Sequence, residues 1–266
     1  MQDIIVHLDE PASSEARLAV AKAVAGKFGA RLSALFARSS SNYFDVTAGF
    51  PGDHVLAASR QARALFEREC GPGGRWMELL HGEPDFLMQE TAFCARYSNL
   101  TVLGQPDEGR HMPENLVERV ILHSGAPVLV VPHHGRFETV GAHIMVGWNA
   151  SRECARAVHD ALPLLRKAAS VTLAVMNAAI RPDGGRSEGL PPVAVLDHLA
   201  ANGVAAGIEN LVGEGVGAMD LLLSRAADVG ADLLVMGAST HGPFSSFGPG
   251  FRHVLGHMTL PVLFSH

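Results

Sequence analysis

The sequence Ala-Asp-Leu-Leu-Val-Met-Gly occupies residues 231–237. It is followed by a loop rich in Gly, Ser, Pro and Phe, by a short helical pattern, and by Pro-Val-Leu-Phe at residues 261–264. An apolar strand that runs into a glycine-rich turn before a helix is the arrangement with which parallel α/β proteins hold phosphate groups. Residues 231–266 therefore predict a parallel sheet with a candidate phosphate site at the end of one strand.

A second, weaker copy of this unit lies in the first half of the chain. Leu-Thr-Val-Leu-Gly at residues 100–104 corresponds to Leu-Leu-Val-Met-Gly at residues 233–237. Pro-Val-Leu occurs at residues 127–129 and again at residues 261–263. Because order, spacing and residue type agree, we infer that the chain contains the same α/β unit twice.

The boundary between the copies is a polar junction, His-His-Gly-Arg-Phe-Glu-Thr, at residues 133–139. After it the pattern of the N-terminus restarts, since Ile-Ile-Val-His-Leu-Asp at residues 4–9 corresponds to Ile-Met-Val-Gly-Trp-Asn at residues 144–149. We therefore predict two domains, residues 1–134 and residues 141–266.

Short apolar runs alternate with helical patterns in both copies, and this alternation indicates parallel sheets with helices on both faces. Ser13 and Ser151 stand before helical patterns and are candidate N-caps. The predicted strands are residues 4–8, 31–37, 76–80, 100–103 and 127–131, then 144–148, 171–176, 206–212, 232–236 and the run that begins at Pro261.

Composition excludes several classes of function. The chain has 266 residues, of which 47% are hydrophobic and 18% charged, and its net charge is −6. No block of Lys and Arg is present, so nucleic acid and anionic membranes are not expected partners. The N-terminus has no signal-peptide pattern and no apolar run is long enough for a membrane span, so we expect a soluble, cytoplasmic protein. Three widely spaced cysteines do not suggest a disulfide framework.

Several segments of the sequence resemble the universal stress protein family in its tandem-domain form, and together they cover nearly the whole chain. The matching segments are residues 146–165, 231–238 and 253–263 in the second copy and residues 117–120 and 125–131 in the first. The resemblance implies two tandem Rossmann-like, five-stranded parallel sheets of the adenine nucleotide alpha hydrolase-like kind. It also implies that the fifth strands pair across a pseudo-twofold axis, so that one chain is an intramolecular pseudo-dimer.

Family members that bind ATP share Gly-x2-Gly-x9-Gly-(Ser/Thr) after the fourth strand, where main-chain N–H groups hold the phosphates. The second copy departs from this pattern. Gly237 matches the first glycine, but Thr240 replaces the second. Counting back from Pro261 places the last glycine at Gly248, which is followed by proline instead of Ser or Thr, and the loop is shorter than in the family.

Other residues of the second copy belong to the same candidate nucleotide site. His241 lies in the loop, and Gly250 could help to form a phosphate cradle in another register. Asn149 stands where the nucleotide binders carry Asp, and the neighbouring Trp148 is either a stacking partner for a base or a core residue. We interpret the second copy as a damaged site for ATP or another adenine nucleotide.

The first copy retains the acidic residue, Asp9, and the first glycine, Gly104. However, Glu114 and Asn115 stand at the Gly-Ser position, and residues 107–108 are also acidic. Carboxylates in place of phosphates repel them strongly when a site is partly desolvated. We therefore expect that the first copy cannot hold a triphosphate.

The C-terminal histidines are a further candidate feature. His253 and His257 share a helix face, with His241 before them and His266 after them, and that spacing could ligate zinc. No Glu follows His253 as a metalloprotease motif requires, and imidazoles are also simply tolerated near a helix C-terminus. We predict no metal site.

Two long loops, at residues 38–50 and 177–190, are either lids over a ligand or merely mobile.

No catalytic constellation is apparent: the sequence lacks a nucleophile elbow, a Walker lysine motif and an obvious carboxylate pair. The leading hypothesis is therefore a stress-response binding module with little or no catalysis. One alternative is an adenine-nucleotide binder or slow ATPase that works through the second domain, and another is a regulator that responds to metal or a small ligand. A homodimer of the tandem chain stays open, since the last strand needs its edge covered.

Overall fold

Strand β1 (Asp3–Leu8) lies at the centre of the first of two units into which the chain divides, Met1–Glu138 and Thr139–His266. The computed structural model describes residues 1–39, 52–71, 74–80, 83–106, 112–176, 193–211, 217–241 and 246–266. The two loops considered as lids fall for the most part outside these residues, as does the acidic pair at residues 107–108.

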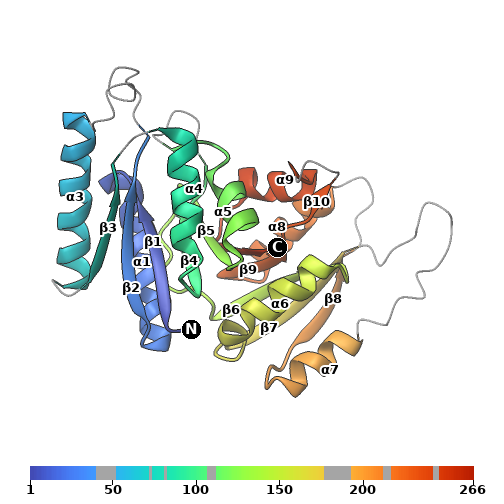
Figure 1. Cartoon of the computed structure of the whole chain (residues 1–266). Coiled ribbons are helices and arrows are strands. Elements are labelled where there is room, and N and C mark those ends of the chain that lie inside the picture. Colours follow the sequence, from blue (N-terminus) through green and yellow to red (C-terminus); the bar gives the residue numbers. More distant parts are fainter. Residues whose placement is uncertain are drawn as a thin grey trace. The chain divides into compact units, whose positions relative to one another are not determined.

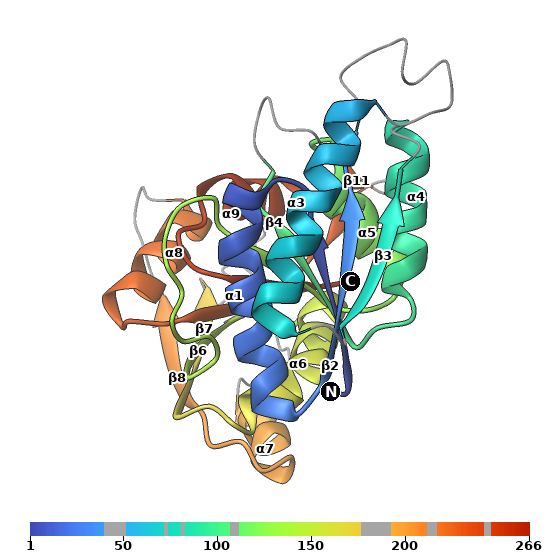
Figure 2. The same ribbon diagram turned by 90° about the vertical axis from the view of Figure 1, so that its left-hand side faces the viewer.

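In the first unit, parallel strands follow the order β3-β2-β1-β4-β5. Helices α1 and α3 cover one face of the sheet and α4 and α5 the other (Figures 1 and 2). The elements after β1 are α1 (Pro11–Phe28), β2 (Arg31–Ala37), α3 (Asp53–Cys70), β3 (Arg75–Leu79), α4 (Pro84–Ala95), β4 (Leu100–Gly104), α5 (Leu116–Ser124) and β5 (Val128–Val131).

The second unit repeats this arrangement, with parallel strands in the order β12-β9-β6-β7-β8. A short antiparallel ribbon, β10 with β11, lies outside this sheet. The elements are β6 (His143–Trp148), α6 (Arg152–Leu165), β7 (Ser170–Met176), α7 (Val193–Ala201), β8 (Gly207–Leu211), α8 (Ala218–Asp228), β9 (Leu233–Gly237), β10 (Thr240–His241), β11 (Ser246–Phe247), α9 (Pro249–His257) and β12 (Val262–Ser265).

The central strands are apolar because helices cover both of their faces. Residues Ile4 to Leu8 of β1 are all buried, and so are the first four residues of β4 and of β9. The predicted fold, two units of parallel strands alternating with helices, is confirmed. The predicted pairing of the two fifth strands stays a prediction.

Helix ends follow local chemistry. Gly29 ends α1 and Gly125 ends α5 in the left-handed conformation that glycine adopts without strain. Ser151 caps α6 as predicted, since its hydroxyl accepts a hydrogen bond from Cys154 N at 3.2 Å. The prediction of Ser13 as the cap of α1 is wrong: the helix begins at Pro11, whose fixed φ suits the first helical position, and the N-cap is Glu10.

Candidate functional site

The carboxyl ends of β1 and β4 meet at the point where the strand order of the first unit reverses, which is where open α/β sheets place their ligands. Asp9 follows β1 and Gly104 ends β4, so the structure brings these two predicted residues to the same edge of the sheet. Arg17 joins them from α1, and it lies with Asp9 and Gly104 around one small cavity.

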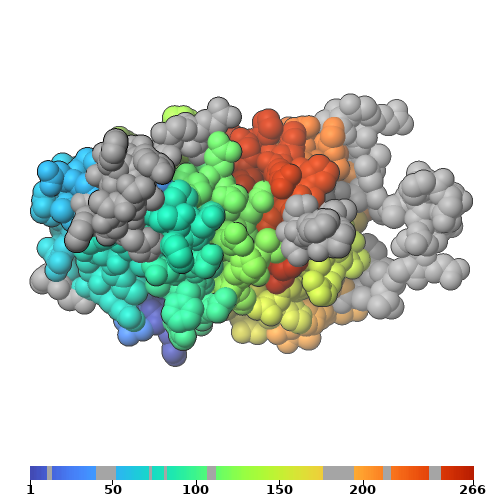
Figure 3. All heavy atoms as spheres, turned by 45° about the horizontal axis from the view of Figure 1, so that its top comes forward, coloured from blue at the N-terminus to red at the C-terminus, as the bar shows by residue number. Residues whose placement is uncertain are grey.

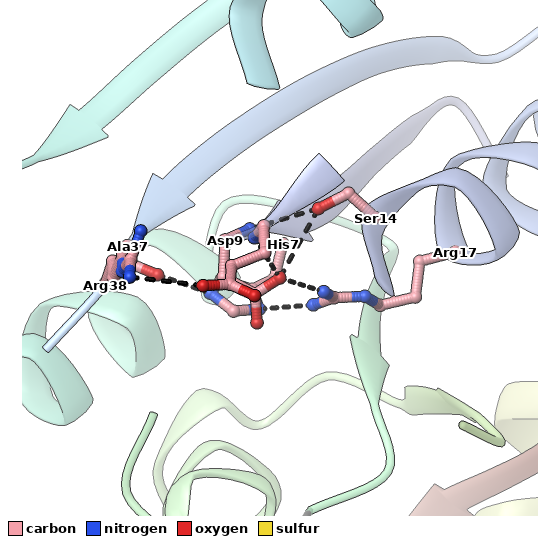
Figure 4. A network of polar contacts seen from close by, with 7 residues as sticks. His7, Asp9, Ser14, Arg17, Ala37 and Arg38 are labelled. Atoms are coloured by element: carbon pink, nitrogen blue, oxygen red, sulfur yellow. Dashed lines mark hydrogen bonds and ion pairs between the residues drawn. The ribbon is translucent and has the colours of Figure 1, made fainter. Parts of the chain in front are cut away.

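Arg17 is the centre of a buried polar network at this edge (Figure 4). Its Nη2 forms an ion pair with Oδ1 of Asp9, and its Nη1 lies 2.8 Å from Nδ1 of His7. All three residues are buried, with exposed fractions of 2% for His7, 3% for Arg17 and 6% for Asp9. The guanidinium therefore satisfies a carboxylate and an imidazole at the same time, away from water.

The hydrogen bonds assign the tautomer of His7. A guanidinium can only donate, so Nδ1 of His7 accepts from Arg17, and Nε2–H donates to Ala37 O at 2.9 Å. The pKa of His7 is lowered from 6.5 to about 4, chiefly by burial and then by the neighbouring Arg17, while Asp9 opposes the shift. His7 is thus a neutral connector between β2 and α1.

Asp9 is also held by its own turn. Its Oδ1 accepts from Glu10 N at 2.6 Å and from the Ser14 hydroxyl at 3.4 Å, while Asp9 N donates to Ser14 Oγ at 3.2 Å. Beyond it, Arg38 Nη2 lies 3.1 Å from Oε1 of Glu10. The carboxylate of Asp9 is therefore bonded within the protein, to its own turn and to Arg17.

Gly104 is close to the same arginine. A Cβ atom at this position would lie 3.2 Å from Cδ and Nε of Arg17. The cavity lined by Arg17, Asp9, His7 and Gly104 has a volume of about 40 Å³. A site for a drug-sized ligand or a cofactor usually has a volume of roughly 300–1,000 Å³. The cavity is therefore the size of a few water molecules.

Sequence reasoning identified Asp9 and Gly104 but missed His7, Ser14 and Arg17. A signal for the two helical residues exists in the sequence, because Ser14 and Arg17 share a face of α1 with the buried residues Leu18 and Ala21. A polar side chain at a core position of a helix needs a buried hydrogen-bonding partner. Asp9 is the partner of both Ser14 and Arg17.

In the second unit, Gly237 has the same place at the end of β9, but its surroundings differ. A Cβ atom on Gly237 would lie 2.4 Å from Cys154 N and from Glu153 C, in the first turn of α6. The backbone of α6 thus packs directly on this glycine. The packing of α6 on β9 therefore requires that residue 237 has no side chain.

Asn149 is a turn residue in the structure. It is exposed, and its Oδ1 accepts a hydrogen bond from Ser151 N at 3.0 Å, which is an Asx-turn. The intervening Ala150 has a φ of 59°, an unusual conformation for alanine that this turn requires. Trp148 ends β6 and is only half-buried. Asn149 thereby positions the start of α6.

The loop after β9 forms the β10–β11 ribbon, which the sequence did not predict. Thr240 pairs with Phe247, and His241 pairs with Ser246. The side chains of Thr240 and His241 lie outside the described residues, as do residues 242–245. Gly248 N donates to Ser239 O at 3.0 Å, so the main-chain donor of this predicted phosphate glycine is already bonded.

The amino end of α9 carries two of the glycines that the sequence predicts for a phosphate cradle. Gly248 is the N-cap without a side-chain hydrogen bond, Pro249 is the first helical residue, and Gly250 follows. A Cβ atom on Gly250 would lie 3.5 Å from Met219, an ordinary van der Waals contact. Gly250 therefore has space that Gly237 does not have.

The C-terminal histidines have protein partners. The rings of His253 and His257 stack at 4.3 Å, and His253 Nε2 lies 2.6 Å from Oδ1 of Asp220 in α8. His266 Nδ1 lies 2.8 Å from Ala238 O. Within the part of the chain that the structure describes, no group of three metal-ligating side chains occurs. The absence of a metal site stays a prediction, since the side chain of His241 is not described.

No protein-family model matches the sequence, and no curated protein matches it. Solved structures of other proteins do match this chain. A universal stress protein from Archaeoglobus fulgidus DSM 4304 has 16% identity and a TM-score of 0.70, over 98% of this chain and 95% of that chain. A structure assigned to the universal stress proteins, from Pseudomonas aeruginosa UCBPP-PA14, has 19% identity and a TM-score of 0.60, over 100% of this chain and 93% of that chain.

A shorter match, over about half of this chain, is a universal stress protein family member from Arabidopsis thaliana with AMP bound. It has 21% identity and a TM-score of 0.35, over 47% of this chain and 90% of that chain.

Among the described helices, none is both long and apolar enough to cross a membrane. The two matches over the full length confirm the resemblance at the level of the fold. The chain therefore has the tandem, Rossmann-like α/β fold of the universal stress proteins.

Proposed function

We propose that this chain is a binding module of the universal stress protein type, with degenerate nucleotide sites and no catalytic activity. The observation that carries the proposal is the ion pair of Arg17 with Asp9 at the carboxyl ends of β1 and β4. The pair places a buried guanidinium beside Gly104 and leaves a cavity of about 40 Å³. Holding ATP there in the family manner would require breaking a buried ion pair, which is costly.

The second unit supports the same proposal by a different route. Gly237 packs against the first turn of α6, and Gly248 N is bonded to Ser239 O. The side chain of Asn149 is bonded to Ser151 N. Three residues of the candidate nucleotide site therefore serve the local fold. The module would act by binding a partner in the cytoplasm, with its two domains as a pseudo-dimer.

The alternative is an adenine-nucleotide binder or slow ATPase that works through the second unit. The amino end of α9 favours this alternative, because helix N-termini attract anions and Gly250 leaves room near the main chain. Titration calorimetry of the whole chain with ATP and Mg²⁺ separates the two functions. The binding-module proposal expects no saturable heat up to millimolar ATP.

Two variants make the calorimetry decisive. Gly250→Asp places a carboxylate in the first turn of α9, where it favours the helix but repels phosphate. Gly250→Ala is the matched control, since its methyl group would meet only Met219 at 3.5 Å. Micromolar ATP binding that persists in Gly250→Ala and disappears in Gly250→Asp would replace our proposal with the nucleotide function.

A further inference from the structure

Helices α4 and α5 pack side by side on one face of the first unit, and a surface groove lies between them. Its volume is about 480 Å³, within the range of roughly 300–1,000 Å³ that is usual for small-molecule sites. Figure 3 shows the blue-green atoms of α4 beside the green atoms of α5 at the surface. The described residues that line the groove are all distinct from those of the candidate nucleotide sites.

Each of the two helices contributes one face to the groove. On α5, Arg119 and His123 are four residues apart, so their side chains are neighbours on the helix surface. On α4 and its C-cap, the lining residues follow the same kind of spacing, and they are Gln89, Ala92, Phe93 and Arg96. The spacing places basic and apolar side chains together along the groove.

Arg96 is held by contacts that leave part of its guanidinium open. Its Cζ lies 5.8 Å from the centre of the Phe93 ring, and its Nε donates to His123 O at 3.0 Å. In the part of the chain that the structure describes, neither of its Nη groups has a hydrogen-bond partner. The guanidinium therefore presents two nitrogen atoms, and such a fork is suited to a carboxylate.

Arg119 brings a second positive charge to the groove. Its Nη1 lies 3.3 Å from Nε2 of His123, and because a guanidinium can only donate, the imidazole accepts and is neutral. The pKa of His123 is lowered, chiefly by burial and then by Arg119 and Arg96. His123 therefore lies in the positive field of both arginines. Neither arginine forms an ion pair with any residue that the structure describes.

Glu90 also lines the groove, and it is exposed. The lining thus contains two guanidinium groups, one carboxylate and a neutral imidazole, which leaves one positive charge in excess. Apolar surface lies beside these charges, since the Phe93 side chain is 52% exposed. One negative charge on a ligand balances this lining, whereas a polyanion exceeds it and is repelled by Glu90.

We propose that the groove between α4 and α5 binds a small monoanion with an apolar body, of the arylalkyl carboxylate class. Its carboxylate lies at Arg96 and Arg119, and its apolar body packs along Phe93 and Ala92. This inference goes beyond the proposed function, because it gives the chain a small-molecule ligand away from both candidate nucleotide sites. Titration with ATP tests the proposed function separately, so the failure of either leaves the other to its own experiment.

Three probes that share one apolar body test the charge of the ligand: phenylbutyrate, phenylbutanol and phenylbutylamine. Titration calorimetry of the full-length chain should show saturable binding of the acid at millimolar concentration or below. The alcohol should bind roughly tenfold more weakly, since it lacks the charge-assisted hydrogen bonds, and the amine should not bind. No saturable binding of the acid, or equal binding of all three probes, would overturn the proposal.

Variants of the lining test which residues bind the acid. Arg119→Gln removes the charge but keeps an amide donor for His123, so it should weaken the acid roughly tenfold and leave the alcohol unchanged. Arg119→Lys should retain most of the affinity, and Glu90→Gln should raise it by removing the opposing charge. Arg60→Gln, at an exposed position of α3, is the matched control and should change nothing.

Circular dichroism confirms that each variant is folded. An affinity for the acid that Arg119→Gln leaves unchanged, or that Glu90→Gln lowers, contradicts the proposed site. Proton NMR of the His123 ring, with the signal assigned by His123→Asn, then locates the acid. A bound carboxylate offsets the charges of Arg96 and Arg119, so saturating phenylbutyrate should raise the pKa of His123, and phenylbutanol should not. The same pKa with and without the acid would mean that it binds elsewhere and would overturn the proposal.

Discussion

The side chain of Arg17 lies against the backbone of Gly104, so that a Cβ atom on this glycine would stand 3.2 Å from Cδ and Nε of the arginine. The sequence motif predicts Gly104 as the first glycine of a phosphate loop, yet the group beside it is the protein's own cation. The ion pair of that cation with Asp9 makes the site internally neutral. The stability of the first unit and the state of its candidate site therefore depend on the same few contacts.

Substituting Gly104 by alanine should destabilise the protein by about 1–2 kcal/mol, because overpacking beside a buried, bonded side chain forces it out of position. Urea unfolding of the wild type and Gly104→Ala measures the difference. Gly250→Ala is the control, since its Cβ would make only an ordinary contact with Met219 at 3.5 Å, and its effect should be much smaller. Equal midpoints for both variants would contradict the close packing of Arg17 on Gly104.

Replacing Arg17 by methionine should cost about 3–5 kcal/mol, because it leaves the buried carboxylate of Asp9 without its cation. His7 Nδ1 loses its donor as well. The double variant Arg17→Met/Asp9→Asn should be more stable than Arg17→Met alone, since the uncompensated charge is gone. Chemical unfolding of the wild type, Arg17→Met, Asp9→Asn and the double variant gives the four free energies of a double-mutant cycle. If the two single-variant losses of unfolding free energy simply add in the double variant, the two residues do not interact.

A methyl group on Gly237 should be poorly tolerated, although the residue lies at the end of a strand. Its Cβ would stand 2.4 Å from backbone atoms of Glu153 and Cys154, which cannot move without shifting α6. We expect Gly237→Ala to lower the unfolding free energy by about 3 kcal/mol, at the upper end of overpacking effects. Loss of ligand binding in such a variant would therefore report damage to the fold and not a lost phosphate contact.

The control for this substitution is Gly256→Ala in α9. A Cβ atom on Gly256 would meet nothing within 4 Å, and alanine is favoured over glycine in a helix by about 1 kcal/mol. Thermal unfolding should place Gly256→Ala slightly above the wild type and Gly237→Ala well below it. A Gly237→Ala protein as stable as the wild type would show that α6 does not pack on β9 in this way.

Much of the fold was predictable because hydrophobic patterning reports it directly. The apolar runs around Ile4, Leu100, Ile144 and Leu233 are buried central strands, and the repeated Pro-Val-Leu marks the fifth strand of each unit. Pattern alone did not predict the β10–β11 ribbon. Each of its strands has only two residues, which is too short for a periodic signal.

The candidate site was less predictable, because its key contact joins α1 to the end of β1. A sequence motif predicts Asp9 and Gly104 as ligand-binding residues. It contains no information that the side chain of Arg17 pairs with Asp9 and packs beside Gly104. The same limit applies to Asn149. The sequence analysis placed it in the candidate nucleotide site, and in the structure its side chain forms the turn before α6. Such roles depend on tertiary contacts, which sequence spacing does not encode.

Acidification should destabilise the protein through His7. The pKa of this buried imidazole is lowered from 6.5 to about 4, chiefly by burial and then by Arg17. Between these two values the unfolded chain binds a proton that the folded chain does not. The free energy of unfolding should therefore fall as the pH falls from about 6.5 to about 4, by roughly 3 kcal/mol in total.

His7→Gln isolates this contribution, because glutamine can donate to Ala37 O and accept from Arg17 but does not titrate in this range. Asp9 and Arg17 face the site in both proteins, and all other titrating groups are shared. Urea unfolding at several pH values between 4 and 7 should give a shallower pH dependence for His7→Gln than for the wild type. Parallel curves for the two proteins would mean that His7 is not held neutral by its burial and by Arg17.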